Sequence, residues 1–278
     1  MKNGSPKRDW RRSAFTLVTG AFLFLAPTAS SAQSAQPDSP LPQDSAQTHA
    51  DGRRTMALLP ANLARGVVGV FAMGNVRPAL VGAAAAGISS FFDDRVRRAI
   101  SNSDSTFGRA GEVSGGGIVM GGVVAGLFAA SRFSDRQRYR AATYDLLTGM
   151  LATEGYTVLL KAAVNRTRPS GPSSRFSSSF PSGHTSTTFA LASVIERHAG
   201  WKAGLPAYAF ASFVGASRVR FNRHYLSDVV AGAALGIIVG RTSVRMNGRP
   251  LPASRQGRHA AVSVSMLRGP GIGVAIGF

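Results

Sequence analysis

The 278-residue sequence contains no cysteine. Disulfides, thiolate nucleophiles and cysteine-based metal sites are therefore excluded for this chain. Its stability has to come from side-chain packing or from a surrounding bilayer, because no covalent cross-link can contribute.

Charged residues are scarce, and acidic ones are the scarcest. They make up 16% of the sequence, against roughly 25% in soluble domains. The 32 Lys and Arg residues outnumber the 13 Asp and Glu residues, which gives a net charge of +19. Such a basic surface suits nucleic acid, anionic lipid or a phosphorylated substrate. Because no zinc knuckle or RNA-binding aromatic strand is present, we expect no nucleic-acid partner and favour phosphate or lipid.

Residues 1–32 have the three-part pattern of a secretory signal peptide. A basic start is followed by the apolar run Ala14–Ala26 and by the small residues Ser30–Ala32. An uncleaved membrane anchor is the alternative. We expect export to the bacterial cell envelope, with a site that faces the periplasm. Residues 33–55 are rich in Gln, Ser, Pro and Asp and predict a disordered linker.

Six apolar segments follow, separated by polar breaks or by breaks with Gly or Pro. Strand-like alternation is absent and several segments exceed the length of an ordinary strand, so we expect helices. The fold class predicted is all-α, a bundle of about six apolar helices over residues 56–245. The segments are Val67–Phe92, Val113–Ser131, Ala141–Lys161, Thr185–His198, Ala203–Ser217 and Leu226–Gly240.

The tail, residues 246–278, has a different pattern. Residues 261–267 and 272–278 alternate apolar with small or polar side chains around the turn sequence Arg268–Gly271. This pattern predicts a short β-hairpin. We expect the hairpin to pack on the helical domain or on a neighbouring chain.

Three polar motifs stand where apolar segments begin or end. The first, KAAVNRTRP, places Lys161 and Arg168 near a helix end, where a point charge and a guanidinium fork suit an oxyanion. The second, PSGH, places Ser182 as a helix cap, Gly183 at a close backbone approach and His184 beside the N–H groups of the first turn.

The third motif, SRVRFNRHYLSD, contains Arg218 and puts Asp228 four residues after His224, on the same helical face. A carboxylate that orients an imidazole raises the basicity of the other ring nitrogen, which suits a nucleophile. Each motif alone also fits a purely structural role, such as a charge at a helix end or a surface ion pair. Because all three stand at ends of successive helices, they can fold onto one face.

Together the motifs resemble the type-2 phosphatidic acid phosphatase superfamily, with KxxxxxxRP at Lys161–Pro169, PSGH at Pro181–His184 and SRxxxxxHxxxD at Ser217–Asp228. The resemblance implies a metal-independent phosphatase without a cofactor. It implies that His224 is the nucleophile, that Asp228 orients it and that His184 is the general acid. The phosphate-binding residues that it implies are Lys161, Arg168, Ser182, Gly183 and Arg218.

Several functions share this pattern. We favour a membrane-associated enzyme that acts on lipid phosphates, because the segments are apolar and rich in small residues. The short segments Thr185–His198 and Ala203–Ser217 keep open a soluble periplasmic acid phosphatase, since a span needs about 20 residues. A vanadium-dependent haloperoxidase and a non-catalytic lipid-binding scaffold are further alternatives.

Overall fold

The structure, a computed structural model, describes residues 54–100, 106–172 and 174–248, and the backbone of 261–266 and 272–277. The predicted signal peptide and residues 33–53 of the predicted linker lie outside the described residues. Arg54 and Thr55, which we assigned to the linker, contact the helices: Arg54 Nη2 lies 2.9 Å from Asp145 Oδ2, and the Thr55 carbonyl accepts from Tyr144.

The first unit of the chain, which ends at Gly248, is helical, and this confirms the predicted all-α class. Its described α-helices are α3 (Leu59–Val70), α4 (Val76–Ser90), α5 (Asp93–Ile100), α6 (Thr106–Ser114), α7 (Gly117–Ser131), α8 (Gln137–Val164), α9 (Gly183–Ala199), α10 (Trp201–Arg220) and α11 (Leu226–Asn247). Three short 3-10 helices, η1 (Met56–Leu58), η2 (Met73–Asn75) and η3 (Arg175–Ser177), lie between them.

Two of the six predicted segments, Val67–Phe92 and Val113–Ser131, each contain a break between two helices, and the second includes only the last two residues of α6. The first breaks between α3 and α4 with a bend of 59°, where the buried Asn75 amide donates to the carbonyls of Gly69 and Val70. The second breaks between α6 and α7 with a bend of 41°, at Gly115–Gly116. The short charged helix α5 was not predicted, because it has no apolar run of its own.

Helices α9 and α11 pack with their backbones in contact. Gly232, Gly236 and Gly240 form a stripe along α11, and a Cβ at Gly236 would lie only 2.2 Å from the Ser186 carbonyl oxygen. A Cβ at Gly240 would lie 2.2 Å from Ser193 Oγ. Only glycine allows this approach. The contact brings the first turn of α9 beside the first turn of α11.

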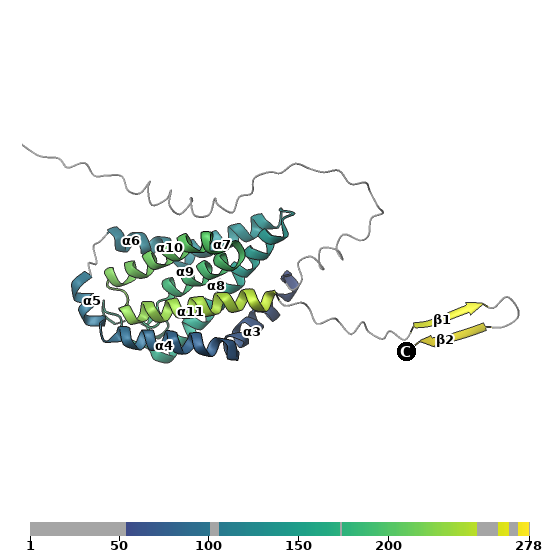
Figure 1. Cartoon of the computed structure of the whole chain (residues 1–278), viewed down its shortest axis with the longest axis horizontal. Coiled ribbons are helices and arrows are strands. Elements are labelled where there is room, and N and C mark those ends of the chain that lie inside the picture. Colours follow the sequence, from purple (N-terminus) through teal and green to yellow (C-terminus); the bar gives the residue numbers. More distant parts are fainter. Residues whose placement is uncertain (1–53, 101–105, 173, 249–260, 267–271, 278) are drawn as a thin grey trace, which may run out of the picture. The chain divides into compact units, whose positions relative to one another are not determined.

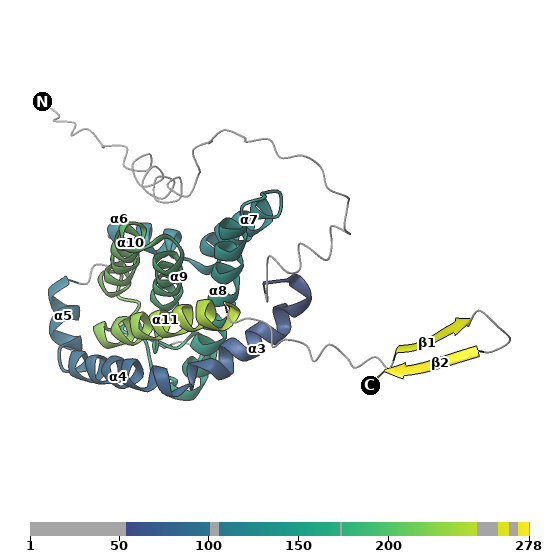
Figure 2. The ribbon, with the colours of Figure 1, turned by 45° about the vertical axis from the view of Figure 1, so that its right-hand side comes forward.

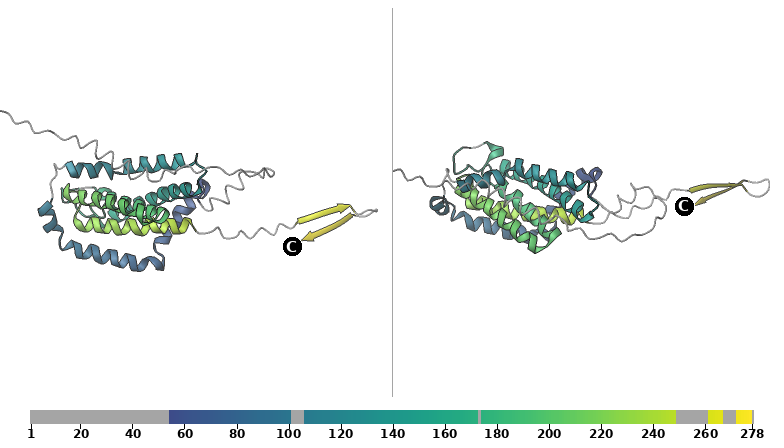
Figure 3. Two further views of the ribbon diagram at one scale, coloured as in Figure 1. Left: turned by 45° about the horizontal axis from the view of Figure 1, so that its top comes forward. Right: turned by 90° about the horizontal axis from the view of Figure 1, so that it is seen from above.

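Helix α9 contacts α8, α10 and α11 and lies among them (Figures 1 and 2). Helix α4 packs on α11 on one side, whereas α6 and α7 lie on the other side of the bundle (Figure 3). The apolar core joins α7, α8 and α9 through Met120, Val124, Leu146, Met150, Leu191 and Val194. As a result, the ends of α8 and α10 meet the starts of α9 and α11.

Large apolar side chains remain exposed on the outer helices, among them Phe71, Leu80 and Phe91 around α4 and Ile118 on α7. Within the described part of the chain, α11 is long and apolar enough to cross a membrane. The pairs α3–α4 and α6–α7 would add two more spans if each bent pair counts as one.

The second unit, Arg249–Phe278, is described by itself. In it the backbone of β1 (Ala261–Met266) pairs antiparallel with that of β2 (Ile272–Gly277), with Val264 opposite Val274. The C-terminal hairpin and its expected contact with the helical domain or a neighbouring chain stay predictions.

Candidate active site

Six of the eight predicted site residues line one pocket of about 500 Å³. They come from α8, the following loop, α9, α10 and the loop before α11: Lys161, Arg168, Gly183, His184, Arg218 and His224. Ser182 and Asp228 are fully buried behind the pocket wall. The three sequence motifs therefore converge on one space.

Arg218 lines this pocket and has side-chain donors without a partner in the described part of the chain. The side chain is 2% exposed, and its Nε and Nη1 atoms have no hydrogen-bond partner among the described residues. Its Nη2 atom lies 3.7 Å from Glu112 Oε1. Because a buried cationic donor without a partner is costly, an anion in the pocket would be strongly favoured.

Lys161 and Arg168 add two cations to the lining. Lys161 Nζ donates to the Ser178 carbonyl, and Arg168 Nε donates to the Ser177 carbonyl at 2.7 Å. Arg168 lies just after the end of α8, where Asn165 adopts a left-handed φ of 48°. The chain turns there, so both cations face the space that Arg218 lines.

Ser182 stands at the N-cap of α9, as predicted, although its side chain makes no capping bond. Its hydroxyl instead accepts from Thr185 Oγ1 at 2.9 Å, and its backbone N–H donates to the Asp228 carbonyl at 3.0 Å. The first N–H groups of a helix have no intrahelical acceptor. Gly183 and His184 therefore begin the helix with donors suited to an anion.

The buried His224 ring has a defined hydrogen bond. Nδ1 lies 2.7 Å from the Ser179 carbonyl oxygen, which can only accept, so Nδ1 carries the proton and Nε2 the lone pair. Asp228 Oδ2 lies farther from Nδ1, at 3.7 Å. Burial, together with the neighbouring cations Lys161 and Arg218, lowers the pKa of His224 to about 4, although Asp228 opposes this shift.

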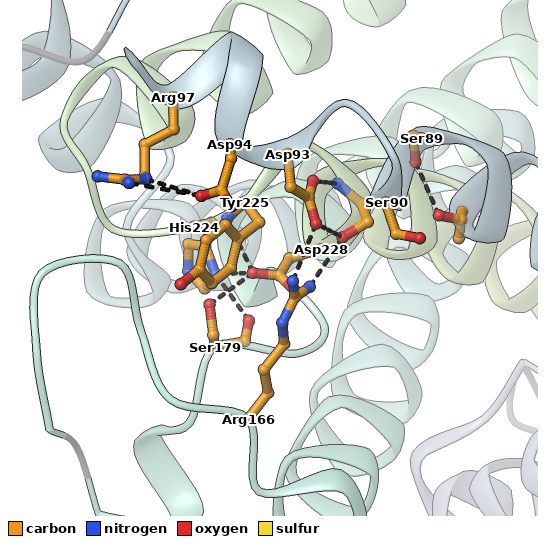
Figure 4. A network of polar contacts seen from close by, with 12 residues as sticks. Ser89, Ser90, Asp93, Asp94, Arg97, Arg166, Ser179, His224, Tyr225 and Asp228 are labelled. Carbon is orange, nitrogen blue, oxygen red and sulfur yellow. Dashed lines mark hydrogen bonds and ion pairs between the residues drawn. The ribbon is translucent and has the colours of Figure 1, made fainter.

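Asp228 holds the surroundings of this ring (Figure 4). Its carboxylate accepts from the Ser179 hydroxyl, from the Tyr225 backbone N–H at 2.9 Å and from Arg166 Nη1 at 2.7 Å. The predicted pairing of Asp228 with His224 is thus made through Ser179, whose carbonyl accepts from the ring.

His184 lies across the pocket from this network. Its Nε2 atom is 3.2 Å from the Glu112 carbonyl oxygen. Burial lowers the pKa of His184 to about 3, with a further contribution from the Arg218 charge. Both histidines are therefore neutral at pH 7 when the pocket is empty.

Sequence reasoning missed several residues of the site. Glu154, Glu112 and Arg223 also line the pocket. Glu154 precedes Lys161 by seven residues, two helical turns, so its place on the same face was available as a signal. Arg166 stands within the first motif, whereas nothing in the sequence connects Asp93 to the site.

Residues 142–250 match the family described as the PAP2 superfamily. A 95-residue stretch is 41% identical to the lipid A 1-phosphatase of Porphyromonas gingivalis, covering 33% of this chain and 21% of that relative. The chain thus spans about a fifth of the length of this curated relative.

Two solved structures are also similar. LpxE of Aquifex aeolicus is 23% identical with a TM-score of 0.46, over 55% of this chain and 95% of that one. A transmembrane PAP2-type phosphatidylglycerolphosphate phosphatase from Bacillus subtilis is 18% identical with a TM-score of 0.40, over 82% of this chain and 94% of that one.

Proposed function

We propose that the protein, whose residues 142–250 match the PAP2 superfamily, is a phosphatase that hydrolyses lipid phosphate monoesters through a phosphohistidine at His224. The observation that carries this proposal is the buried Arg218, which lines one pocket with both histidines and has two donors without a partner among the described residues. A pocket that combines free cationic donors with a nucleophile suits a phosphoryl group.

In the first step, the Nε2 lone pair of His224 attacks phosphorus and forms an N–P bond. The P–O bond to the alcohol breaks, and the departing oxygen takes a proton from His184, which gains that proton when the phosphate anion binds beside it. Lys161, Arg168 and Arg218 stabilise the charge on the three equatorial oxygens. The Ser179 carbonyl stabilises the positive charge that develops on the ring through its bond from Nδ1.

In the second step, water attacks phosphorus and the N–P bond breaks. His184, now neutral, takes a proton from this water. The first step thus leaves His184 as the base for the second step, and the second step restores it as the acid. Inorganic phosphate leaves, and His224 regains its lone pair. Every bond and proton of the cycle is accounted for by the two rings, the substrate, one water and the proton that His184 takes from solvent when the anion binds.

Lipid phosphates are the substrate class that we favour. The pocket wall includes Val158 and Phe176, which are 43% and 66% exposed and offer apolar surface beside the cations. The lipid A 1-phosphatase that resembles this chain acts, by its name, on a phosphorylated lipid. The apolar outer helices also favour a membrane-associated protein, which we place in the cell envelope with its site toward the periplasm.

The test is phosphate release by the purified full chain from a panel of lipid phosphates and soluble monoesters. We expect release from the lipids, inhibition by orthovanadate and no inhibition by EDTA. Strong inhibition by EDTA would show a metal enzyme. Halide-dependent peroxidation with added vanadate, in place of phosphate release, would show a haloperoxidase.

Membrane association is tested separately, by washing membranes that contain the protein with alkaline carbonate. We expect the full chain to remain in the pellet, because its exposed apolar helices would otherwise face water. Release into the supernatant, together with hydrolysis of soluble monoesters, would instead identify a soluble periplasmic phosphatase.

A further inference from the structure

Asp93, in the first turn of α5, lies behind the candidate nucleophile although it is outside the segment that matches the family. The side chain is buried and accepts three hydrogen bonds from two residues. Its Oδ1 accepts from the Ser227 backbone N–H at 2.8 Å, and its Oδ2 accepts from Ser227 Oγ at 2.6 Å and from Arg166 Nη2 at 2.9 Å. Asp93 thus anchors the start of α11.

Arg166 bridges two buried carboxylates. Nη2 binds Asp93 and Nη1 binds Asp228, at 2.9 Å and 2.7 Å. The guanidinium lies over the Tyr225 ring, with 4.1 Å between Cζ and the ring centroid, and Figure 4 shows it between the two acids. Only the planar fork of arginine can bind both carboxylates while it stacks on a ring.

The contacts continue from this bridge to His224. One Asp228 oxygen accepts from Arg166, and the other holds the Ser179 hydroxyl and the Tyr225 N–H. The Ser179 carbonyl then accepts from His224 Nδ1. An unbroken series of hydrogen bonds therefore runs from α5 to the ring that we assign as nucleophile.

We propose that Asp93 and Arg166 are positioning residues for His224, which hold Asp228 and Ser179 so that the ring keeps Nε2 free toward the pocket. This inference rests on the proposed role of His224. Without Arg166, Asp228 would keep a buried charge with no cation bound to it. Its nearest basic neighbour would then be His224, 3.7 Å away.

The charge on Arg166 consequently influences how readily His224 takes a proton. The cations that face the His224 ring are Lys161 from α8 and Arg218 from α10. His184 from α9 interacts with it electrostatically, and the anion that faces it is Asp228 from α11. Removing the Arg166 charge strengthens the field of Asp228 at the ring. We therefore expect its removal to raise the pKa of His224.

The experiment compares Arg166→Gln, Arg166→Lys and Asp93→Asn in the full-length protein. Asp94→Asn is the matched control, because the Asp94 side chain is 68% exposed and pairs only weakly, at 3.4 Å, with Arg97 on the same helix (Figure 4). Two quantities are measured: kcat and KM on a lipid phosphate, and the pH midpoint of C2 hydrogen–deuterium exchange at His224 by mass spectrometry.

We expect Arg166→Gln and Asp93→Asn to lower kcat about 10- to 100-fold with little change in KM, because a misplaced nucleophile loses rate more than binding. Arg166→Gln should raise the exchange midpoint of His224 by about one pH unit. Arg166→Lys should restore the midpoint but only part of kcat, since it keeps the charge and loses the fork. Asp94→Asn should match the wild type in both quantities.

The outcomes separate this inference from the proposed function. If the wild type releases no phosphate from any substrate, the proposed function is wrong, and the exchange midpoint still decides the inference because it needs no substrate. Equal midpoints in Arg166→Gln and Asp94→Asn, or wild-type kcat in Asp93→Asn, would overturn it. Thermal unfolding identifies any unfolded variant, and Arg166→Lys and Asp93→Asn then carry the test.

Discussion

Two networks of the same composition lie toward opposite ends of α8, α9 and α11. One joins His224, Asp228 and Arg166. The other joins His198, Asp145 and Arg54, with His198 Nε2 2.7 Å and Arg54 Nη2 2.9 Å from Asp145 Oδ2. Along α8, Asp145 and Lys161 are sixteen residues apart, roughly 24 Å of helix.

The networks differ in what surrounds them. The Asp145 carboxylate is surrounded by Arg54, His198 and Asn247, whose amide donates to Oδ1 at 2.8 Å. None of these residues lines the pocket, so we call this group the closed network. At the other end, the His224 ring faces open volume beside Arg218, which has free donors. The comparison indicates that a catalytic network requires open space and a cation with unused donors beside the histidine, whereas a closed network holds helices together.

Replacing the histidine of each network should separate them most clearly. We expect His224→Ala to lower kcat on the order of 10⁴-fold or more, because no other group can form the phosphoryl–enzyme bond. His198→Gln should leave kcat within about twofold, since its ring contacts only the closed network. Phosphate release is the measurement, and near-normal turnover by His224→Ala would refute the nucleophile assignment.

Arg218→Gln should have the next largest effect. It removes a buried cation aimed at the phosphoryl oxygens, so we expect kcat to fall about 10²- to 10³-fold. Arg54→Gln is its counterpart in the closed network and should keep the wild-type kcat in molecules that remain folded. A comparable loss in both variants would mean that the Arg218 effect is one of folding rather than of catalysis.

His184→Ala should show a dependence on the leaving group. We expect kcat to fall about 10²- to 10⁴-fold for an alkyl phosphate, whose departing oxygen needs a proton. An activated aryl phosphate, whose departing oxygen is stable as an anion, should be affected much less. Equal losses on both substrates would contradict the role of His184 as general acid.

The closed network should contribute to stability. Asp145→Asn leaves Arg54 near a neutral amide, and breaking a buried pair costs about 3–5 kcal/mol. We expect a lower unfolding temperature in detergent and an unchanged kcat per folded molecule. An unchanged unfolding temperature would show that this network adds nothing to the helical bundle.

The smallest expected effect is the uptake of a proton by His184 when an anion binds in the pocket. The pKa of His184 is lowered to about 3 in the empty pocket, and a bound anion opposes this by favouring the charged ring. We therefore expect orthovanadate binding at pH 7 to take up a fraction of a proton, which calorimetry in buffers of different ionisation enthalpy measures. His184→Asn should remove this uptake, and an unchanged uptake would assign the proton elsewhere.

Much of the site could be predicted from the sequence, because cations, histidines and a carboxylate at the ends of successive helices indicate an anion-binding site. The three motifs predicted eight residues, of which six line one pocket and two are buried beside it. The helical i, i+4 relation was wrong, because α11 begins at Leu226 and His224 lies in the loop before it. The helical class followed from long apolar runs without strand alternation. Asn75, Arg77 and Pro78 interrupt the apolar pattern near the first break, whereas the break after Ser114 was missed because small and apolar residues continue across it.

By itself, the sequence determined that the chain is helical, free of cysteine chemistry and supplied with an anion-binding set of motifs. Only the tertiary structure decided which neighbours complete those motifs. Asp93 joins the site through packing of α5 against the start of α11, and Ser179 stands between Asp228 and His224. Such contacts depend on where separate helices meet in space, and the local spacing of residues along the chain does not determine these meeting points.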